Sequence, residues 1–212
     1  MKWTQLPLGP VQANAYIVEK ENGEALIIDP GGEGDRLVSF VKSRNLEPLA
    51  ILLTHAHFDH IGAVEKARTQ WSIPVYLHQE ESGWLNDPQK NGSAFFPGVG
   101  GGMTIKPAEK IINGEGPLNI GSFSFEVVET PGHSPGSVSF FNKASKVVFS
   151  GDALFAGSIG RTDLYRGDHD ELLESIEEKL LILPGETIVA PGHGPETTIE
   201  SERRTNPFLS GM

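Results

Sequence analysis

The most informative segment of the sequence is Thr54-His55-Ala56-His57-Phe58-Asp59-His60. It places three histidines and one aspartate directly after the apolar segment 50–53. Side chains repeat every two residues along a strand, so His55 and His57 point the same way and can chelate one ion. Asp59 and His60 begin the helix that we expect next, so the turn can carry them to the far side of the cavity. Because imidazole is the commonest metal ligand, the cluster favours a metal site over a group of surface histidines.

Three more candidate ligands occupy matching places, each beside a glycine and after an apolar strand. They are His133 in Pro131-Gly132-His133, Asp152 in Gly151-Asp152, and His193 in Pro191-Gly192-His193. Glycine lets the backbone approach a crowded site, and strand ends collect ligands in α/β sheets. We therefore predict a first ion on His55, His57 and His133. A second ion would bind Asp59, His60 and His193, with Asp152 bridging both.

The donor atoms indicate which metal and which reaction the site would support. The chain has no cysteine, so thiolate ligands, disulfides and a cysteine nucleophile are excluded. Histidine nitrogen and carboxylate oxygen suit zinc, iron or manganese, and we expect two divalent ions, zinc first. Two cations about 3.5–4 Å apart make hydroxide available near neutral pH and polarise a substrate carbonyl. Asp59 would also orient this nucleophile or accept its proton.

The apolar pattern predicts strands and helices that alternate within one α/β domain over residues 1–212. Hairpins are expected around Asn22-Gly23 and between strands 137–141 and 146–149. Helices are expected at 35–44, 60–71 and 169–181, and a capping box at 197–200 predicts a terminal helix. The Gly- and Pro-rich segment 83–102 reads as a long loop. Its aromatic residues are either walls of a substrate pocket or pins to the core: Trp84, Phe95 and Phe96.

Charge and composition narrow the function classes. The 212 residues include 17 basic and 28 acidic side chains, a formal net charge of −11. Such a chain repels nucleic acid and anionic membranes, which disfavours a nuclease. No run of about 18 apolar residues and no apolar N-terminal segment are present, so we expect a cytoplasmic protein. The oligomeric state is not predicted.

The complete set of motifs resembles the metallo-β-lactamase-fold hydrolases over nearly the whole chain. His-x-His-x-Asp-His followed by Pro-Gly-His, Gly-Asp and Pro-Gly-His is highly specific for that superfamily. The resemblance implies an α/β fold, a four-layer αββα sandwich with the metals at one edge of the sheets. Asp29 matches the family's aspartate in an early Asp-Pro-Gly turn, which implies contact with the metal ligands. Capping of that turn is an equally good interpretation.

Within the superfamily the chain looks most like glyoxalase II, the hydroxyacylglutathione hydrolases. The segment from Gly151-Asp152 to Gly160-Arg161 is similar to the one where those enzymes bind glutathione, so Arg161 inherits that role. Asp163 stands where the family has a tyrosine, and the family's C-terminal helical domain has no counterpart in these 212 residues. The chain thus resembles the short bacterial glyoxalase II-like proteins. The resemblance implies hydrolysis of a small thioester such as S-D-lactoylglutathione.

Three other functions compete with this interpretation. Persulfide dioxygenases resemble the chain at Gly160-Arg161-Thr162-Asp163 and use one iron at the positions of His55, His133 and Asp152. A non-catalytic metal-binding module would close its coordination, whereas catalytic sites keep one position open. A true β-lactamase is less favoured, because one subclass needs cysteine where Asp152 stands and another does without the bridging aspartate.

Overall fold

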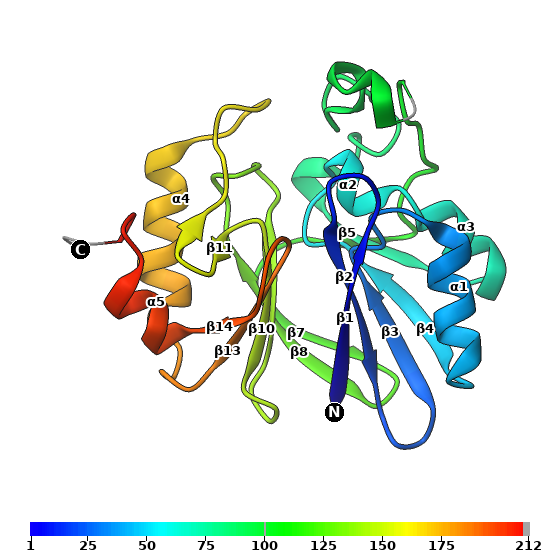
Figure 1. The fold of residues 1–212 in the computed structure, drawn as a ribbon, viewed down its shortest axis with the longest axis horizontal. Helices are drawn as coiled ribbons and strands as arrows, with labels where there is room; N and C mark the ends of the chain where they lie inside the picture. The colour runs from blue at the N-terminus through cyan, green and yellow to red at the C-terminus, as the bar shows by residue number, and fades with distance from the viewer. Residues whose placement is uncertain (100, 210–212) are drawn as a thin grey trace. The chain divides into compact units, whose positions relative to one another are not determined.

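The computed structural model describes residues 1–99 and 101–209. Contacts divide the chain into two compact units, which we call unit 1 (Met1–Asn113 with Ile120–Phe123) and unit 2 (Gly114–Asn119 with Ser124–Met212). Each unit has one six-stranded sheet with helices packed on it (Figure 1). Two strands of the second sheet each have one terminal residue that is assigned to unit 1. The single domain over residues 1–212 stays a prediction.

The sheet of unit 1 is mixed, and its strand order is β1-β2-β3-β4-β5-β6. Its strands are β1 (Lys2–Leu8), β2 (Ala13–Glu19), β3 (Glu24–Ile28), β4 (Glu47–Leu52), β5 (Val75–His78) and β6 (Lys110–Ile112). The first three pair antiparallel and the others parallel. The antiparallel pairing of β2 with β3 confirms the hairpin predicted around Asn22-Gly23.

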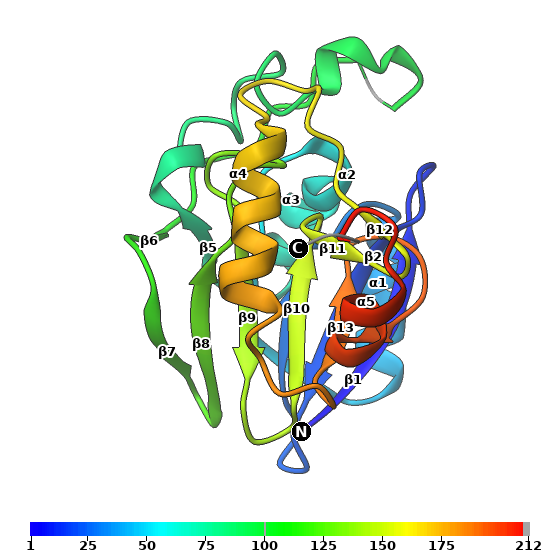
Figure 2. The same ribbon diagram turned by 90° about the vertical axis from the view of Figure 1, so that its left-hand side faces the viewer.

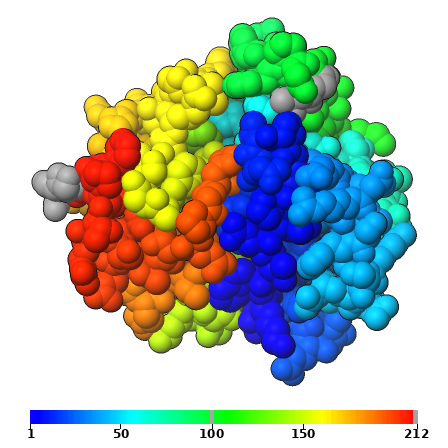
Figure 3. Space-filling model, in the orientation of Figure 1, coloured from blue at the N-terminus to red at the C-terminus, as the bar shows by residue number. Residues whose placement is uncertain are grey.

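Strand β1 has no clear apolar alternation in the sequence, and we did not predict it. It forms by pairing with β2, where Trp3 lies opposite Val18. As the edge of the sheet it is only partly buried, and its atoms reach the surface in the space-filling view (Figure 3). Pro7 suits such a position, because an edge strand does not need every amide for pairing.

Helices α1 (Gly34–Ser43) and α3 (Val64–Trp71) pack side by side on the first sheet. Leu37 of α1 and Val64 of α3 enter the same core as Ile51 of β4. The single helix predicted over 60–71 is wrong, because α2 (Phe58–Ile61) ends before α3 begins. The backbone leaves helical geometry at Ala63, whose amide donates to the carbonyl of Pro30 at 2.8 Å. At the neighbouring Gly62 a Cβ atom would lie 2.2 Å from the carbonyl oxygen of Gly31. The turn after β3 passes too close for a side chain there.

The sheet of unit 2 has the order β14-β13-β10-β9-β8-β7. Its strands are β7 (Gly116–Ile120), β8 (Phe123–Glu129), β9 (Val138–Asn142), β10 (Val147–Gly151), β13 (Ile188–Pro191) and β14 (Thr197–Thr198). The antiparallel pair β9–β10 confirms the second predicted hairpin. A separate small hairpin joins β11 (Leu154–Phe155) to β12 (Ser158–Ile159).

Two helices cover this second sheet (Figure 2). Helix α4 (His169–Ser175) continues as a π-helical turn, η4 (Ile176–Leu180), and α5 is Ile199–Thr205. Leu172, Ile176 and Ile199 form one core with strand residues of the sheet. The predicted terminal helix is confirmed, although its cap is Thr198, whose side chain accepts from the amide of Ser201, rather than Thr197.

The described residues of segment 83–102 are largely irregular, as predicted, apart from two short 3-10 turns, η2 (Ser93–Phe95) and η3 (Pro97–Val99). An earlier 3-10 turn, η1 (Gln79–Glu81), follows β5. Among the described residues, no helix combines the length and apolar character needed to cross a membrane.

Candidate metal centre

The segment His55–His60 lies where unit 1 stops pairing as a sheet. Strand β4 ends at Leu52, and side-chain and loop acceptors then receive the amides. The Thr54 amide donates to Asp29 Oδ1 at 2.8 Å, and the Phe58 amide donates to the carbonyl of Asn91 at 2.9 Å. His57 then forms the N-cap of α2, which carries Asp59 and His60. The four predicted ligands of this unit therefore lie on one turn that hydrogen bonds from its amides hold in place.

Hydrogen bonds determine which ring nitrogen of His55 and His60 can bind a metal. Thr54 Oγ1 donates to Asp29 Oδ2 at 2.6 Å, because a carboxylate only accepts. That hydroxyl oxygen then accepts from His55 Nδ1 at 3.0 Å, and Asp29 Oδ2 accepts from His60 Nδ1 at 3.0 Å. Both rings thereby leave Nε2 available for a metal, and carboxylate contacts of this kind orient histidine ligands in metal sites. Asp29 Oδ2 therefore contacts the predicted ligand His60 directly and His55 through the Thr54 hydroxyl, which is the kind of contact that the resemblance implies.

The spacing of the unit 1 donors suits a metal ion. Bonds of about 2.0–2.2 Å at tetrahedral angles place two ligands of one ion about 3.4 Å apart. His60 Nε2 lies 3.8 Å from Asp59 Oδ2, close to that spacing and too far for a hydrogen bond. The rings of His55 and His57 meet edge to face with centroids 4.9 Å apart. Donor atoms of Asp29, His55 and His60 also fall within 4.8 Å of one another.

Unit 2 brings its three predicted ligands together around one carboxylate. Asp152 Oδ2 lies 3.6 Å from His133 Nε2 and 3.6 Å from His193 Nε2. Each distance matches two ligands of one ion, and Asp152 stands between two imidazoles as a bridging carboxylate would. The register of the sheet helps this placement, because Gly151 lies opposite Pro191 and the Gly192 amide donates to the Gly151 carbonyl at 2.7 Å.

Arg161 contacts this site through its backbone. His133 Nδ1 donates to the carbonyl oxygen of Arg161 at 2.7 Å, which leaves Nε2 to face Asp152. The approach depends on Gly160, whose Cβ, if present, would lie 1.8 Å from the carbonyl oxygen of Asp152. The guanidinium forms a two-point ion pair with Asp163, at 2.6 and 2.8 Å. These hydrogen bonds lower the pKa of Asp163 to about 2 and raise the pKa of Arg161. Substrate binding by Arg161 stays a prediction.

Sequence reasoning missed two residues that hold the ligand segment. Glu81 is fully buried, and its Oε2 accepts from the amide of Ala56 at 2.5 Å. Asn91 is also buried, and its amide group donates to the carbonyls of Trp84 and Met103. Glu81 lies 25 residues from Ala56 in the sequence, so no local pattern could have indicated the contact.

The aromatic residues of segment 83–102 divide between the two interpretations. Trp84 is buried, with its ring 5.9 Å from His57, and Phe96 packs on Phe58 at 4.9 Å between centroids. These two rings pin the loop. Phe95 is 64% exposed and could still line a pocket.

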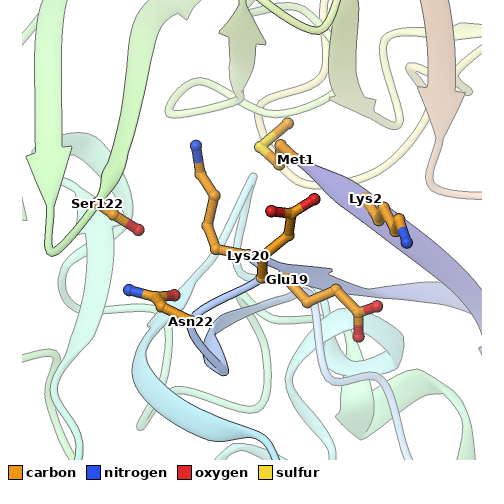
Figure 4. A pocket seen from close by; sticks show the side chains of 7 residues that line it. Met1, Lys2, Glu19, Lys20, Asn22 and Ser122 are labelled. Atoms are coloured by element: carbon orange, nitrogen blue, oxygen red, sulfur yellow. The ribbon is translucent and has the colours of Figure 1, made fainter.

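The donor chemistry and spacing fit divalent ions in both units: imidazole nitrogens and carboxylate oxygens, with several rings oriented by acceptors. A pocket of about 500 Å³ in unit 1 lies elsewhere, at the N-terminus and the β2–β3 hairpin (Figure 4). Glu19, Lys20 and Asn22 line it, and no predicted metal ligand does.

Known proteins resemble the chain over its full length. The protein named "Probable metallo-hydrolase YqgX" from Bacillus subtilis (strain 168) is 55% identical over 212 residues, with 100% of this chain and 99% of that protein covered. Hydroxyacylglutathione hydrolase GloC of Haemophilus influenzae is 36% identical, with 97% and 96% covered.

Several solved structures have a similar fold. The structure of BLEG-1 B3 metallo-β-lactamase has a TM-score of 0.96 at 55% identity and covers 99% of this chain and 100% of its own. TTHA1623 in a di-iron-bound form has a TM-score of 0.85 at 44% identity, with 97% and 100% covered. ETHE1 from Myxococcus xanthus has a TM-score of 0.77 at 28% identity, with 100% and 85% covered. The predicted metallo-β-lactamase fold is confirmed.

The family profile matches most of the chain, residues 8–193, and so includes all seven predicted ligands. Together with metal-binding His/Asp groups in the structure, the match identifies a superfamily of metallo-hydrolases. The chain belongs to the metallo-β-lactamase superfamily.

Proposed function

We propose that this protein is a thioesterase that hydrolyses a small acyl thioester at a dinuclear metal centre. The observation that carries the proposal is the position of Asp152 Oδ2, 3.6 Å from the Nε2 atoms of both His133 and His193. A carboxylate between two imidazoles is what a bridge between two ions requires. The similarity to a relative named hydroxyacylglutathione hydrolase supports a thioester as the substrate class.

The division of ligands that we propose is the one that the sequence predicts. His55, His57 and His133 would hold one ion, Asp59, His60 and His193 the other, and Asp152 both. When bound, two such ions supply a hydroxide at neutral pH and polarise the carbonyl of the substrate. Asp29 and Thr54 orient the rings of His55 and His60 so that Nε2 of each ring would face an ion.

The side chains then determine how the substrate reacts. Asp59, whose side chain is 14% exposed, orients the nucleophile or takes its proton. The thiol leaves as a thiolate without help from a strong acid, because the pKa of a thiol is about 8.5. Arg161, more than half exposed, can exchange its Asp163 partner for a carboxylate on the thiol moiety of the substrate. The proposed substrate is a free small molecule, and neither nucleic acid nor a membrane takes part. We propose the cytoplasm as the location of the protein.

Zinc is the metal we propose, and iron is the alternative that the di-iron form of TTHA1623 supports. The decisive experiment measures metal content by elemental analysis and S-D-lactoylglutathione hydrolysis on the same preparation. We expect two ions per chain and hydrolysis that a chelator abolishes. A fully loaded protein without thioesterase activity would refute the proposal and favour a non-catalytic metal-binding module.

β-Lactam hydrolysis is the second candidate, supported by the 55% identity to BLEG-1 B3 metallo-β-lactamase. Both reactions place a nucleophile on a carbonyl carbon, so the same centre could perform either. Turnover of a chromogenic cephalosporin should be far slower than turnover of the thioester, and the reverse order would favour the lactamase. One iron per chain with thiol-dependent oxygen uptake would instead establish a persulfide dioxygenase.

A further inference from the structure

Glu81 is a buried acidic residue that no step of the proposed reaction uses. It ends the 3-10 turn η1, and its side chain has no exposed surface. Its Oε2 accepts a hydrogen bond of 2.5 Å from the amide of Ala56. Ala56 is itself buried and stands between His55 and His57, the two predicted ligands of one ion.

The contact is one of three that hold the backbone beyond the end of β4. The amides of residues 54, 56 and 58 each donate to an acceptor from another part of unit 1. These acceptors are the Asp29 carboxylate, the Glu81 carboxylate and the Asn91 carbonyl, at 2.8, 2.5 and 2.9 Å. Asp29 follows β3 and Glu81 follows β5, the two strands that flank β4, and Glu81 is the middle acceptor of the three.

This position gives Glu81 control over the chelating pair. The peptide planes on either side of Ala56 determine the directions in which the His55 and His57 side chains leave the backbone. A hydrogen bond to the Ala56 amide fixes one of these planes. Burying a charge is costly, but a charge-assisted hydrogen bond is stronger than a neutral one, and a bound dication offsets the cost further.

We propose that Glu81 is a positioning residue for the metal centre, which holds His55 and His57 in the geometry that chelates one ion. The inference rests on the metal centre of the proposed function and does not depend on which substrate is hydrolysed.

The test compares three variants of the full chain: Glu81→Ala, Glu81→Gln and Glu80→Ala. Glu80 is the matched control, because it neighbours Glu81 on the same turn and is exposed. The readouts are metal affinity, by competition with a chelator, and the visible absorption of the Co²⁺-loaded protein. The melting temperature of the metal-free protein reports folding separately.

Glu81→Ala should lower metal affinity by about 10–100-fold, the usual effect of losing an outer partner of the ligands, and change the Co²⁺ bands. Glu81→Gln should keep both near the parent values, because its amide oxygen can accept from Ala56. Glu80→Ala should match the parent. Where Glu81→Ala fails to fold, Glu81→Asp replaces it. Withdrawing the carboxylate by one methylene should lower metal affinity although the charge is kept.

Parental affinity and bands in Glu81→Ala would overturn the proposal. So would equal damage in Glu81→Gln and Glu81→Ala, because charge rather than position would then matter. A parent that binds metal but hydrolyses no thioester refutes the proposed function and leaves this inference standing. A parent that binds no metal overturns both.

Discussion

Units 1 and 2 supply predicted ligands in opposite ways. Unit 1 carries four on one continuous turn, residues 55–60, after a strand has ended. Unit 2 carries three on three separate loops, each following a different strand of one sheet. A continuous turn needs acceptors from elsewhere to hold its amides, whereas separate loops are placed by the register of the strands before them.

This difference indicates which substitutions should disturb the predicted ligands of each unit. In unit 1 the acceptors Asp29, Glu81 and Asn91 come from three distant segments. In unit 2 the sheet provides most of the placement, and a close backbone approach at Gly160 provides the remainder. Substitutions of buried polar residues should therefore damage unit 1, and added side-chain volume should damage unit 2.

Replacing Asp152 with alanine should have the largest effect, because its carboxylate lies between two predicted ligands. Metal content should fall, and activity should drop by more than the about 10–100-fold that loss of an outer partner costs. Elemental analysis and thioester kinetics measure both. Asp170→Asn, an exposed carboxylate on α4, serves as the control. Unchanged metal content in Asp152→Ala would remove the bridging role.

Replacing Asp29 with alanine should have the next largest effect and tests the acceptors of unit 1. It removes one acceptor from the Thr54 amide, the Thr54 hydroxyl and His60 Nδ1 together. We expect metal affinity to fall by about 10–100-fold. Asp35→Asn, an exposed helix carboxylate paired with Lys66, should leave affinity unchanged. If Asp29→Ala bound metal as the parent does, Asp29 would only cap its turn.

The same comparison explains what could be predicted from the sequence. The ligand turn of unit 1 was recognisable because its spacing is local, and the Asn22-Gly23 hairpin was recognisable for the same reason. The candidate ligands of unit 2 could be proposed because each follows an apolar strand beside glycine. Strand β1 and the contact of Glu81 with Ala56 were not, because both depend on partners distant in sequence. The helix break at Ala63 was not recognisable either, because its amide donates to Pro30, which is distant in sequence.

Replacing Gly160 with alanine adds volume where unit 2 is tightest. The new Cβ would overlap the carbonyl oxygen of Asp152, so the backbone must move and the Arg161 carbonyl with it. We expect a loss of stability of about 1–3 kcal/mol, typical of overpacking. Metal affinity should fall with it, because His133 loses its Nδ1 partner. Gly83→Ala, which has no atom within 4 Å of the added Cβ, is the control in a thermal melt. Equal melting temperatures for both variants would contradict this account.

Replacing Asp163 with asparagine should have the smallest effect, since it changes an exposed pair outside both sets of ligands. Losing the partner of Arg161 should lower the KM for an anionic thioester by about a few-fold at most, because exposed ion pairs are weak. The Asp163 pKa is lowered from 3.8 to about 2, so the pair is present above pH 3.8 and is lost as the pH falls towards 2. KM should therefore show no dependence on this pair between about pH 5 and 9, where both groups keep their charge. A thioester without negative charge on its thiol moiety is the matched control, and its KM should be the same in parent and variant. If KM rose instead for the anionic substrate, the ion pair would be holding Arg161 in its binding position rather than competing for it.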